Sequence, residues 1–175
     1  MAAAAPPPRL VTRIVLEFMI DVLATATRAH GGDIKAMVVF MAIQHANIEC
    51  VEIDPGRPGG GFGAFLDDDL RRPITTHALA QSVSLPPPET CRRYVQRLLA
   101  AGYCRRIDER GLIVLGAVLA GEPFADAVDS TQVAFVRMLR AMHAVGFDVF
   151  AAAALHRGLP EPTVTLAPES MRLAL

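Results

Sequence analysis

The chain has 175 residues, of which 52% are hydrophobic and 6% aromatic, and it has no tryptophan. This length allows one substantial core with extensions, and an apolar content dominated by alanine, leucine and valine favours packed helices over a sheet sandwich. The net charge of −1 argues against a uniformly basic nucleic-acid-binding protein.

The positive charge is nevertheless concentrated in residues 71–110. These forty residues carry eight basic side chains, all of them arginine, and three acidic ones, for a net charge of +5. Residues 1–70 have a net charge of −4 and residues 111–175 a net charge of −2. Arginine donates two parallel hydrogen bonds and suits phosphates and base edges. The block is therefore a candidate nucleic-acid-binding surface.

The cysteines and histidines indicate no metal site and no catalytic site. Cys50, Cys91 and Cys104 form no CxxC pair, so we expect a cytoplasmic protein without disulfides or structural zinc. The first residues lack the pattern of a secretory signal, and no stretch is suited to span a bilayer. Scattered histidines and the lack of a nucleophile motif predict no enzyme activity and no cofactor. A redox role of Cys91 or Cys104 is a weak alternative.

The N-terminal part is expected to be helical. Residues 1–8 are predicted to be a disordered tail, and residues 9–53 to hold two helices for packing or dimerisation. The first, from about Arg9 to Ala29, is apolar on more than one face, so it is either a core helix or a dimer-forming helix. Asp33 is expected to cap the second helix, which ends near Ile48 and joins the domain that follows.

The regions on either side of the arginine-rich block have weaker patterns. Residues 54–72 are predicted to be a solvated linker, because the glycines lack the GK[ST] ending of a phosphate-binding loop. The adjacent carboxylates of Asp67, Asp68 and Asp69 point in different directions, which disfavours a metal site. Residues 117–157 are expected to be helical, with a helix from about Thr131 to Val145 capped by Asp129 or Ser130. Residues 158–175 are predicted to be a proline-containing tail.

Residues 73–116 predict a strand, two helices and a hairpin. Ile74 supplies a short strand, and Thr75 or Thr76 caps the first helix, whose buried side comprises Ala78, Leu79 and Val83. A second helix from about Pro87 to Ala101 follows three prolines and stops at Gly102. Tyr103–Ile107 and Leu112–Leu115 form two strands, with Tyr103 and Ile107 facing inward and Gly111 able to take positive φ in the turn.

The second helix has two distinct faces. Cys91, Val95 and Leu98 follow each other at helical spacing and are expected to face inward, with Leu99 beside them. From Thr90 onward every charge on the helix is positive. The residues left on the outer face are rich in types that pair with guanine, adenine and phosphate: they are Glu89, Thr90, Arg92, Arg93, Gln96 and Arg97.

Several short motifs occur along this segment: Leu79-Ala80, Thr90-Cys91, Arg92-Arg93, Leu98 and Ala101-Gly102. In these residues and in the order of its elements, the segment resembles the winged helix-turn-helix transcriptional regulators of bacteria, the MarR and GntR types among them. The resemblance covers about a quarter of the chain. Cys91 replaces the branched apolar residue usual in that family, and the turn is one residue longer and filled by proline.

The resemblance implies a mostly α-helical winged helix-turn-helix with a small β-hairpin wing, flanked by N- and C-terminal helices. It further implies a homodimeric, sequence-specific regulator that binds double-stranded DNA, with residues 87–101 in the major groove and the wing, residues 103–115, on the backbone or in the minor groove. The alternative is a winged-helix module for protein–protein assembly. A small-molecule effector remains open, because no residue marks a pocket for one.

Two sets of DNA-contacting residues are predicted. The base-edge set is the outer face of the second helix, with Arg93 first among Thr90, Arg92, Arg93 and Gln96. The set for phosphates or the minor groove is Thr76, Arg97, Arg105, Arg106 and Arg110.

Overall fold

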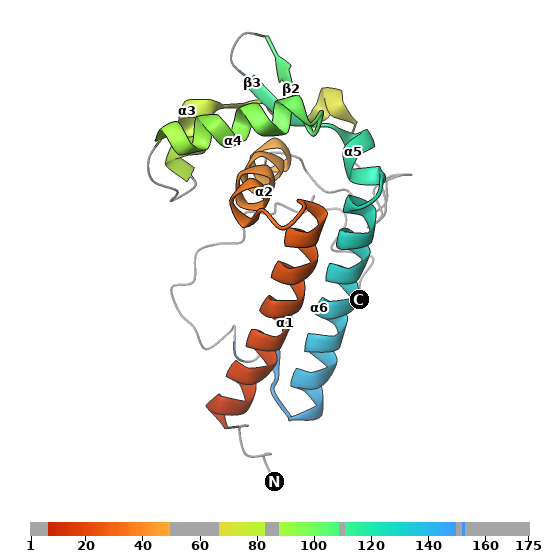
Figure 1. The fold of residues 1–175 in the computed structure, drawn as a ribbon. Coiled ribbons are helices and arrows are strands. Elements are labelled where there is room, and N and C mark those ends of the chain that lie inside the picture. Colours follow the sequence, from red (N-terminus) through yellow and green to blue (C-terminus); the bar gives the residue numbers. More distant parts are fainter. Residues whose placement is uncertain (1–6, 50–66, 83–87, 109–110, 150–151, 153–175) are drawn as a thin grey trace, which may run out of the picture. The chain divides into compact units, whose positions relative to one another are not determined.

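A computed structural model describes residues 7–49, 67–82, 88–108, 111–149 and 152. These residues are mostly α-helical with one small three-stranded antiparallel sheet (Figure 1), which confirms the expected helix-rich class with a small β element. They form two compact units. Unit 1 holds residues 7–32 and the described residues after 122, and unit 2 is Asp33–Glu122. In the described part of the chain, no helix combines the length and apolarity that crossing a membrane requires.

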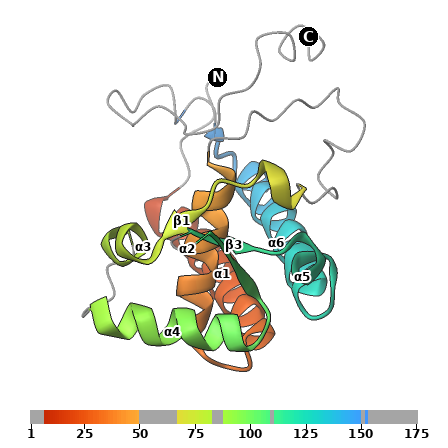
Figure 2. The same cartoon turned by 90° about the horizontal axis from the view of Figure 1, so that it is seen from above.

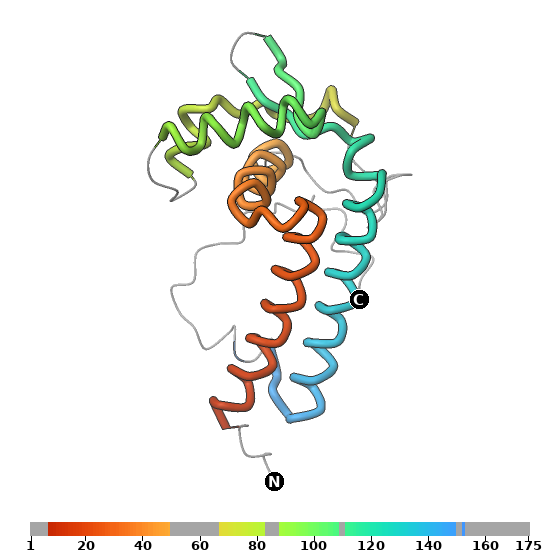
Figure 3. Tube along the Cα trace, viewed as in Figure 1, coloured from red at the N-terminus to blue at the C-terminus, as the bar shows by residue number. Residues whose placement is uncertain are grey.

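Unit 1 is an antiparallel pair of long helices, α1 (Pro8–Ala29) and α6 (Phe124–Ala144). They lie side by side along most of their length (Figures 1 and 3). Phe18 packs edge-on against Phe135 with ring centroids 6.1 Å apart, and His30 packs against Phe124 at 5.1 Å. The first helix begins one residue before its predicted start at Arg9 and ends at the predicted Ala29, which confirms its predicted extent to within one residue.

Helix α6 begins at Phe124 and not near Thr131, so the sequence-based start is wrong. Pro123 stands at the position before the first turn, where its fixed φ suits a helix start. The buried Phe124 ring anchors that turn against His30. Thr131 lies inside the helix and donates its hydroxyl to the Ala127 carbonyl at 2.8 Å, so neither Asp129 nor Ser130 is the cap.

Unit 2 contains most of the buried apolar side chains and all of the strands in the described residues. The β1 strand pairs with β3, which also pairs with β2, and both pairings are antiparallel. Figure 2 looks down on this unit, where β1 and β3 cross α2 and α4 lies beside them. In chain order the elements are α2 (Ile34–Ile48), the 3-10 helix η1 (Asp68–Leu70), β1 (Ile74–Thr75), α3 (Thr76–Ser82), α4 (Pro88–Ala100), β2 (Cys104–Ile107), β3 (Gly111–Val114) and α5 (Gly116–Ala120).

Helix α2 is the central element of unit 2. The Asp33 side chain accepts hydrogen bonds from the amides of Lys35 and Ala36 at 3.1 and 3.0 Å, which confirms the predicted cap. The buried residues Met37, Val39, Phe40 and Ile43 pack the helix into the core formed with α4 and β3. The Phe40 ring meets Tyr103 at 6.2 Å.

Fewer residues of α3 are buried than the sequence suggests. Thr75, and not Thr76, is the capping residue, since its hydroxyl accepts a hydrogen bond from the Ala78 amide at 3.1 Å. Leu79 is fully buried as expected, but Ala78 is exposed. The assignment of Ala78 is therefore wrong, and Val83 and the proline-containing turn lie outside the described residues.

The hairpin strands lie within one residue of their predicted bounds, and Ile107 and Tyr103 are half-buried. The predicted role of Gly111 is wrong: Asp108 takes the positive φ, at 54°, and Gly111 belongs to β3. Gly111 has another reason to be glycine. A Cβ at this position would collide with the Pro73 side chain and lie 3.1 Å from the Ile107 carbonyl oxygen, so only a residue without a side chain lets β3 approach this closely.

Candidate nucleic-acid interface

The inward face of α4 is the one that the sequence predicts. Pro88 is its first residue, and Gly102, with φ of 73°, follows its end. Cys91, Val95 and Leu98 are buried, which confirms the assignment, and Tyr94 is buried with them. Tyr94 was missing from the predicted face, although its position three residues after Cys91 and four before Leu98 fits the same helical spacing.

The outward face of α4 is arginine-rich. Arg92, Arg93, Gln96 and Arg97 are exposed as predicted, whereas Thr90 is half-buried. Arg93 forms no ion pair with any residue that the structure describes. Its guanidinium carbon lies 5.5 Å from the centroid of the Tyr94 ring. The aromatic ring restrains the arginine stem without using its hydrogen-bond donors, so the donors remain available to a ligand.

Arg92 has a weak partner on its own helix. Its guanidinium lies 3.5 Å from the Glu89 carboxylate, and both side chains are strongly exposed, at 69% and 79%. A pair this exposed stabilises a protein by about 0–1 kcal/mol. An incoming anion can therefore displace Glu89 at little energetic cost.

Arg97 has a stronger, structural partner that the sequence did not reveal. It donates a 2.7 Å hydrogen bond to the Asp33 carboxylate and lies 5.3 Å from the Tyr94 ring. The pKa of Asp33 is lowered, first by the hydrogen bond from the Ala36 amide and further by Arg97, against an opposing effect of burial. Arg97 thus links α4 to the start of α2 and is not simply a free surface cation.

The hairpin carries Arg105 and Arg106 next to each other on β2, both exposed. Neighbouring residues on a strand point to opposite faces, so the hairpin presents a cation on each side. Arg105 lies 3.8 Å from the Asp68 carboxylate. Arg106 forms no ion pair within the described residues, and Arg110 lies outside them. The hairpin projects away from α2 (Figure 1).

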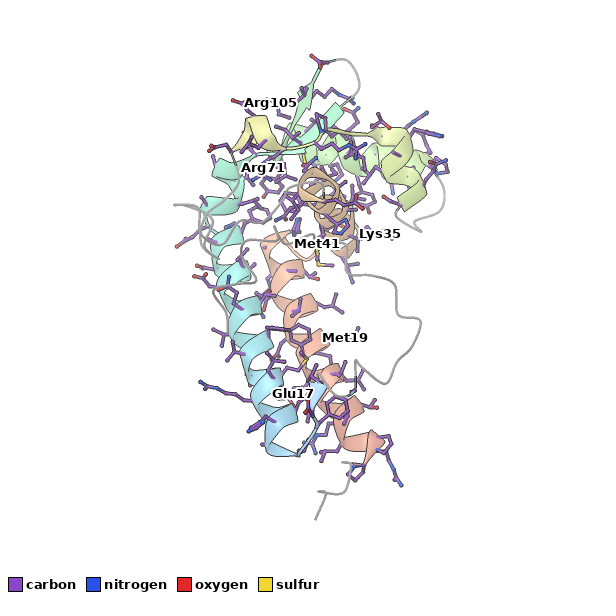
Figure 4. The ribbon with its side chains drawn as sticks, turned by 180° about the vertical axis from the view of Figure 1, so that it is seen from behind. Glu17, Met19, Lys35, Met41, Arg71 and Arg105 are labelled. Carbon is purple, nitrogen blue, oxygen red and sulfur yellow. The ribbon has the colours of Figure 1, made fainter. Side chains whose placement is uncertain are left out.

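The Asp68 carboxylate contacts three other groups. The prediction that residues 54–72 are a solvated linker is therefore wrong at Asp68. It accepts a hydrogen bond from the Gly116 amide at 2.8 Å and lies 3.3 Å from Arg71, whose side chain is 1% exposed. Its third partner is Arg105. Figure 4 shows Arg71 and Arg105 near η1. A run of three aspartates gives no indication of which one contacts the arginines, so these contacts could not be predicted.

Thr76 is the first residue of α3 and is half-buried. It follows the capping residue Thr75, so its own hydroxyl is not needed for the cap. A helix start offers unpaired backbone amides that suit a phosphate, although α3 is too short to count as a site by that feature alone.

The two described cysteines are buried free thiols. Burial raises the pKa of Cys91 and raises the pKa of Cys104 to about 12, so both remain protonated near neutral pH. A neutral, buried thiol is a poor nucleophile, which disfavours the redox alternative. In the described part of the chain, no three His, Cys, Asp or Glu side chains come together as a metal site.

Comparison with known proteins assigns no family: no family model matches the sequence, and neither a curated protein nor a solved structure matches the chain.

Proposed function

We propose that unit 2 is a winged helix-turn-helix domain and that the protein is a sequence-specific regulator that binds double-stranded DNA. The observation that carries this proposal is the outer face of α4, where Arg92, Arg93 and Gln96 are exposed beside a hairpin with two further arginines. The order of elements supports it: α2, β1, α3, α4 and the β2–β3 hairpin follow one another as in a winged helix.

Helix α4 is the proposed recognition helix. Its 13 residues make it about 20 Å long, a length suited to lie along a major groove that is about 12 Å wide. Its apolar face is fixed in the core by Cys91, Val95 and Leu98, so the opposite face is presented rigidly. Rigid presentation matters because base recognition needs hydrogen-bond geometry accurate to a fraction of an ångström.

Arg93 is the proposed base-reading residue. It has no carboxylate partner among the described residues, and the Tyr94 ring restrains it. A guanidinium reads guanine through two parallel hydrogen bonds to O6 and N7. Arg92, Gln96 and Thr90 are proposed as neighbouring base contacts, with Thr90 limited by its half-burial.

The backbone contacts are proposed for Arg105 and Arg106 on the hairpin, for Thr76 at the start of α3, and for Arg110. Arg105 has to exchange the Asp68 carboxylate, 3.8 Å away, for a phosphate. Arg97 has to make the same exchange at Asp33. Its shorter, better-aligned pair makes it the weaker candidate of the two for DNA contact.

The alternative function is assembly with an acidic protein partner. One observation favours it: three arginines of this surface, Arg92, Arg97 and Arg105, already lie beside carboxylates of the same chain. A partner with aspartate or glutamate side chains at similar spacing would use the same chemistry.

Salt dependence separates the two functions. The full chain is first used to select duplexes from a random pool, and binding to the selected duplex is then measured by fluorescence anisotropy over a range of salt concentrations. DNA recognition predicts one enriched sequence and a log–log slope of about −0.9 for each phosphate contacted. No enrichment, together with binding to any duplex only at very low salt, would overturn the proposal and favour the assembly role.

A further inference from the structure

We infer that Glu89 is a base-reading residue of unit 2, and that the duplex recognised by α4 carries a cytosine at the position that Glu89 reaches. The inference rests on the DNA binding proposed above and goes beyond it, because it adds an acidic residue to the arginine-rich surface and names a base. Glu89 lies in the first turn of α4, and its side chain is 79% exposed.

The outward face of α4 has a central line of side chains. Its exposed residues at successive spacings of four, three and four positions are Glu89, Arg93, Gln96 and Ala100. An α-helix turns by about 100° per residue, so these side chains fall within about 60° of one another around the helix axis. The middle of the line is about 180° from the side on which Cys91 and Leu98 are buried. Glu89 therefore points in the same direction as Arg93 and Gln96, away from the core.

Glu89 stands at the end of this line that comes closest to the bases in a recognition helix. In helix-turn-helix proteins the N-terminal residues of that helix contact the base edges. The line is about 16 Å long, which corresponds to about five base pairs. Arg92 and Arg97 lie about 70° to either side of its middle. A side chain on the central line therefore faces the floor of the groove, and the flanking arginines face its two walls.

A carboxylate finds one well-matched partner among the base edges of the major groove. It can only accept hydrogen bonds. Guanine presents two acceptors there, O6 and N7, and thymine presents the acceptor O4 beside a methyl group. Adenine presents its N6 donor next to the acceptor N7, whereas cytosine presents the N4 donor alone. Glu89 is therefore expected to accept a hydrogen bond from cytosine and to be repelled by the acceptors of the other bases.

The ion pair of Glu89 with Arg92 is compatible with this role. The two charged groups are 3.5 Å apart and both side chains are strongly exposed, so the pair adds little to stability and can separate when DNA binds. A carboxylate in the first turn also favours the helix dipole. That effect stabilises α4 with or without DNA, so base preference is the property that distinguishes a reading role from a purely helix-stabilising one.

The negative charge of Glu89 gives its loss an unusual signature. A carboxylate that faces DNA without a donor opposite it is repelled by the phosphates and by base acceptors, which weakens binding to every mismatched duplex. Specificity is a difference between two affinities, and a group that repels wrong partners increases that difference. Removal of Glu89 should therefore raise the affinity for unrelated duplexes, whereas removal of Arg93 should lower it.

The test is the sequence preference of the full chain, with wild type and Glu89→Gln each selecting duplexes from the same random pool. Glu89→Gln keeps the side-chain size and introduces an amide, which pairs with N6 and N7 of adenine. The selected sequence is expected to change from cytosine to adenine at one position only. Glu89→Ala is expected to lose roughly 5- to 150-fold of discrimination at that position and to bind an unrelated duplex more tightly than the wild type does. Circular dichroism checks that the helices remain.

The matched control is Glu49→Gln, which removes the same charge from an exposed residue at the end of α2 and is expected to leave the selected sequence unchanged. Arg92→Gln tests whether Glu89 acts only by holding Arg92, and it is expected to keep cytosine at the position that Glu89 reads.

The outcomes separate this inference from the proposed function. The same selected sequence for wild type and Glu89→Gln, or a loss of the cytosine in Glu49→Gln or Arg92→Gln, would overturn the inference and leave the proposed DNA binding in place. A wild-type preference for another base at the position that changes would also overturn it. A wild type that enriches no sequence would overturn both.

Discussion

The Arg97 guanidinium and the Asp33 carboxylate are joined by a 2.7 Å hydrogen bond across 64 residues of sequence. The second Asp33 oxygen caps α2 by accepting hydrogen bonds from the amides of Lys35 and Ala36. One carboxylate therefore fixes both the start of α2 and the C-terminal half of α4. The orientation of the proposed recognition helix depends in part on this residue.

The first prediction concerns acid stability. Folding lowers the pKa of Asp33 below its ordinary value of 3.8, mainly because the Ala36 amide donates to it. The resulting stabilisation is fully present above pH 3.8 and is lost as the pH falls through the lower folded-state pKa. Asp33→Asn keeps the cap but cannot titrate, so it should be less stable than the wild type at pH 7, and the difference should shrink below pH 3.8. Urea unfolding at a series of pH values measures this.

Arg97→Gln provides the control for this prediction. Arg97 is strongly exposed, so loss of the ion pair alone should cost no more than about 1 kcal/mol, while the Asp33 cap remains. A difference between wild type and Asp33→Asn that is the same at pH 3 and pH 7 would contradict the assigned titration.

The second prediction concerns Asp68. Its replacement in Asp68→Asn removes the charge that faces the buried Arg71 and the exposed Arg105. The free energy of unfolding should fall by about 2 kcal/mol, because the buried Arg71 cation loses the carboxylate charge that faces it, and weakening the partner of a buried charged group costs about 1–3 kcal/mol. At the same time Arg105 is released, so the affinity for non-specific duplex should rise several-fold.

Asp69→Asn is the matched control. Asp69 is the exposed neighbour of Asp68, and its replacement removes the same formal charge. It should change the unfolding free energy by less than about 0.5 kcal/mol. Equal effects of the two variants on stability and on DNA affinity would mean that only net charge matters and that the Asp68 contacts contribute nothing.

The third prediction concerns Asn47, which is fully buried at the end of α2. Its amide donates to the carbonyls of Arg72 and Leu112 at 2.8 and 3.0 Å, and its oxygen accepts from the Val114 amide at 2.9 Å. Asn47→Ala leaves these backbone groups unpaired, at about 1–3 kcal/mol each. Thermal unfolding should show a large loss of stability, whereas Gln44→Ala, one turn earlier and half-buried, should have a small effect.

Much of unit 2 could be predicted because its signals are local. Asp33, Gly102 and Pro88 mark helix ends by their own backbone chemistry, and the spacing of Cys91, Val95 and Leu98 fixes the buried side of α4. These features depend only on residues close in sequence, and the structure agrees with each of them.

The sequence-based predictions that were wrong or missing concern residues whose environment depends on contacts with other parts of the chain. Gly111 is glycine because Pro73 lies against it, and Asp68 is half-buried because it contacts Arg71 and the Gly116 amide. No feature of the sequence around Asp33 indicates that Arg97 donates a hydrogen bond to its carboxylate. The start of α6 was placed too late because Phe124 is anchored by His30, from the other end of the chain. The local sequence pattern does not indicate contacts between residues that are far apart in the chain.

The most direct measurement of the central claim is the affinity of Arg93→Ala for the duplex selected by the wild type, compared with duplexes changed at single positions. If Arg93 reads a guanine, the variant should lose about 1–3 kcal/mol of binding free energy, roughly 5- to 150-fold in affinity, and its discrimination at one base pair only. The Arg97 side chain is held by Asp33 in the free protein, so Arg97→Ala should weaken the binding of all duplexes by a similar, smaller factor. Unchanged affinity and unchanged base preference in Arg93→Ala would contradict the proposal that α4 reads DNA.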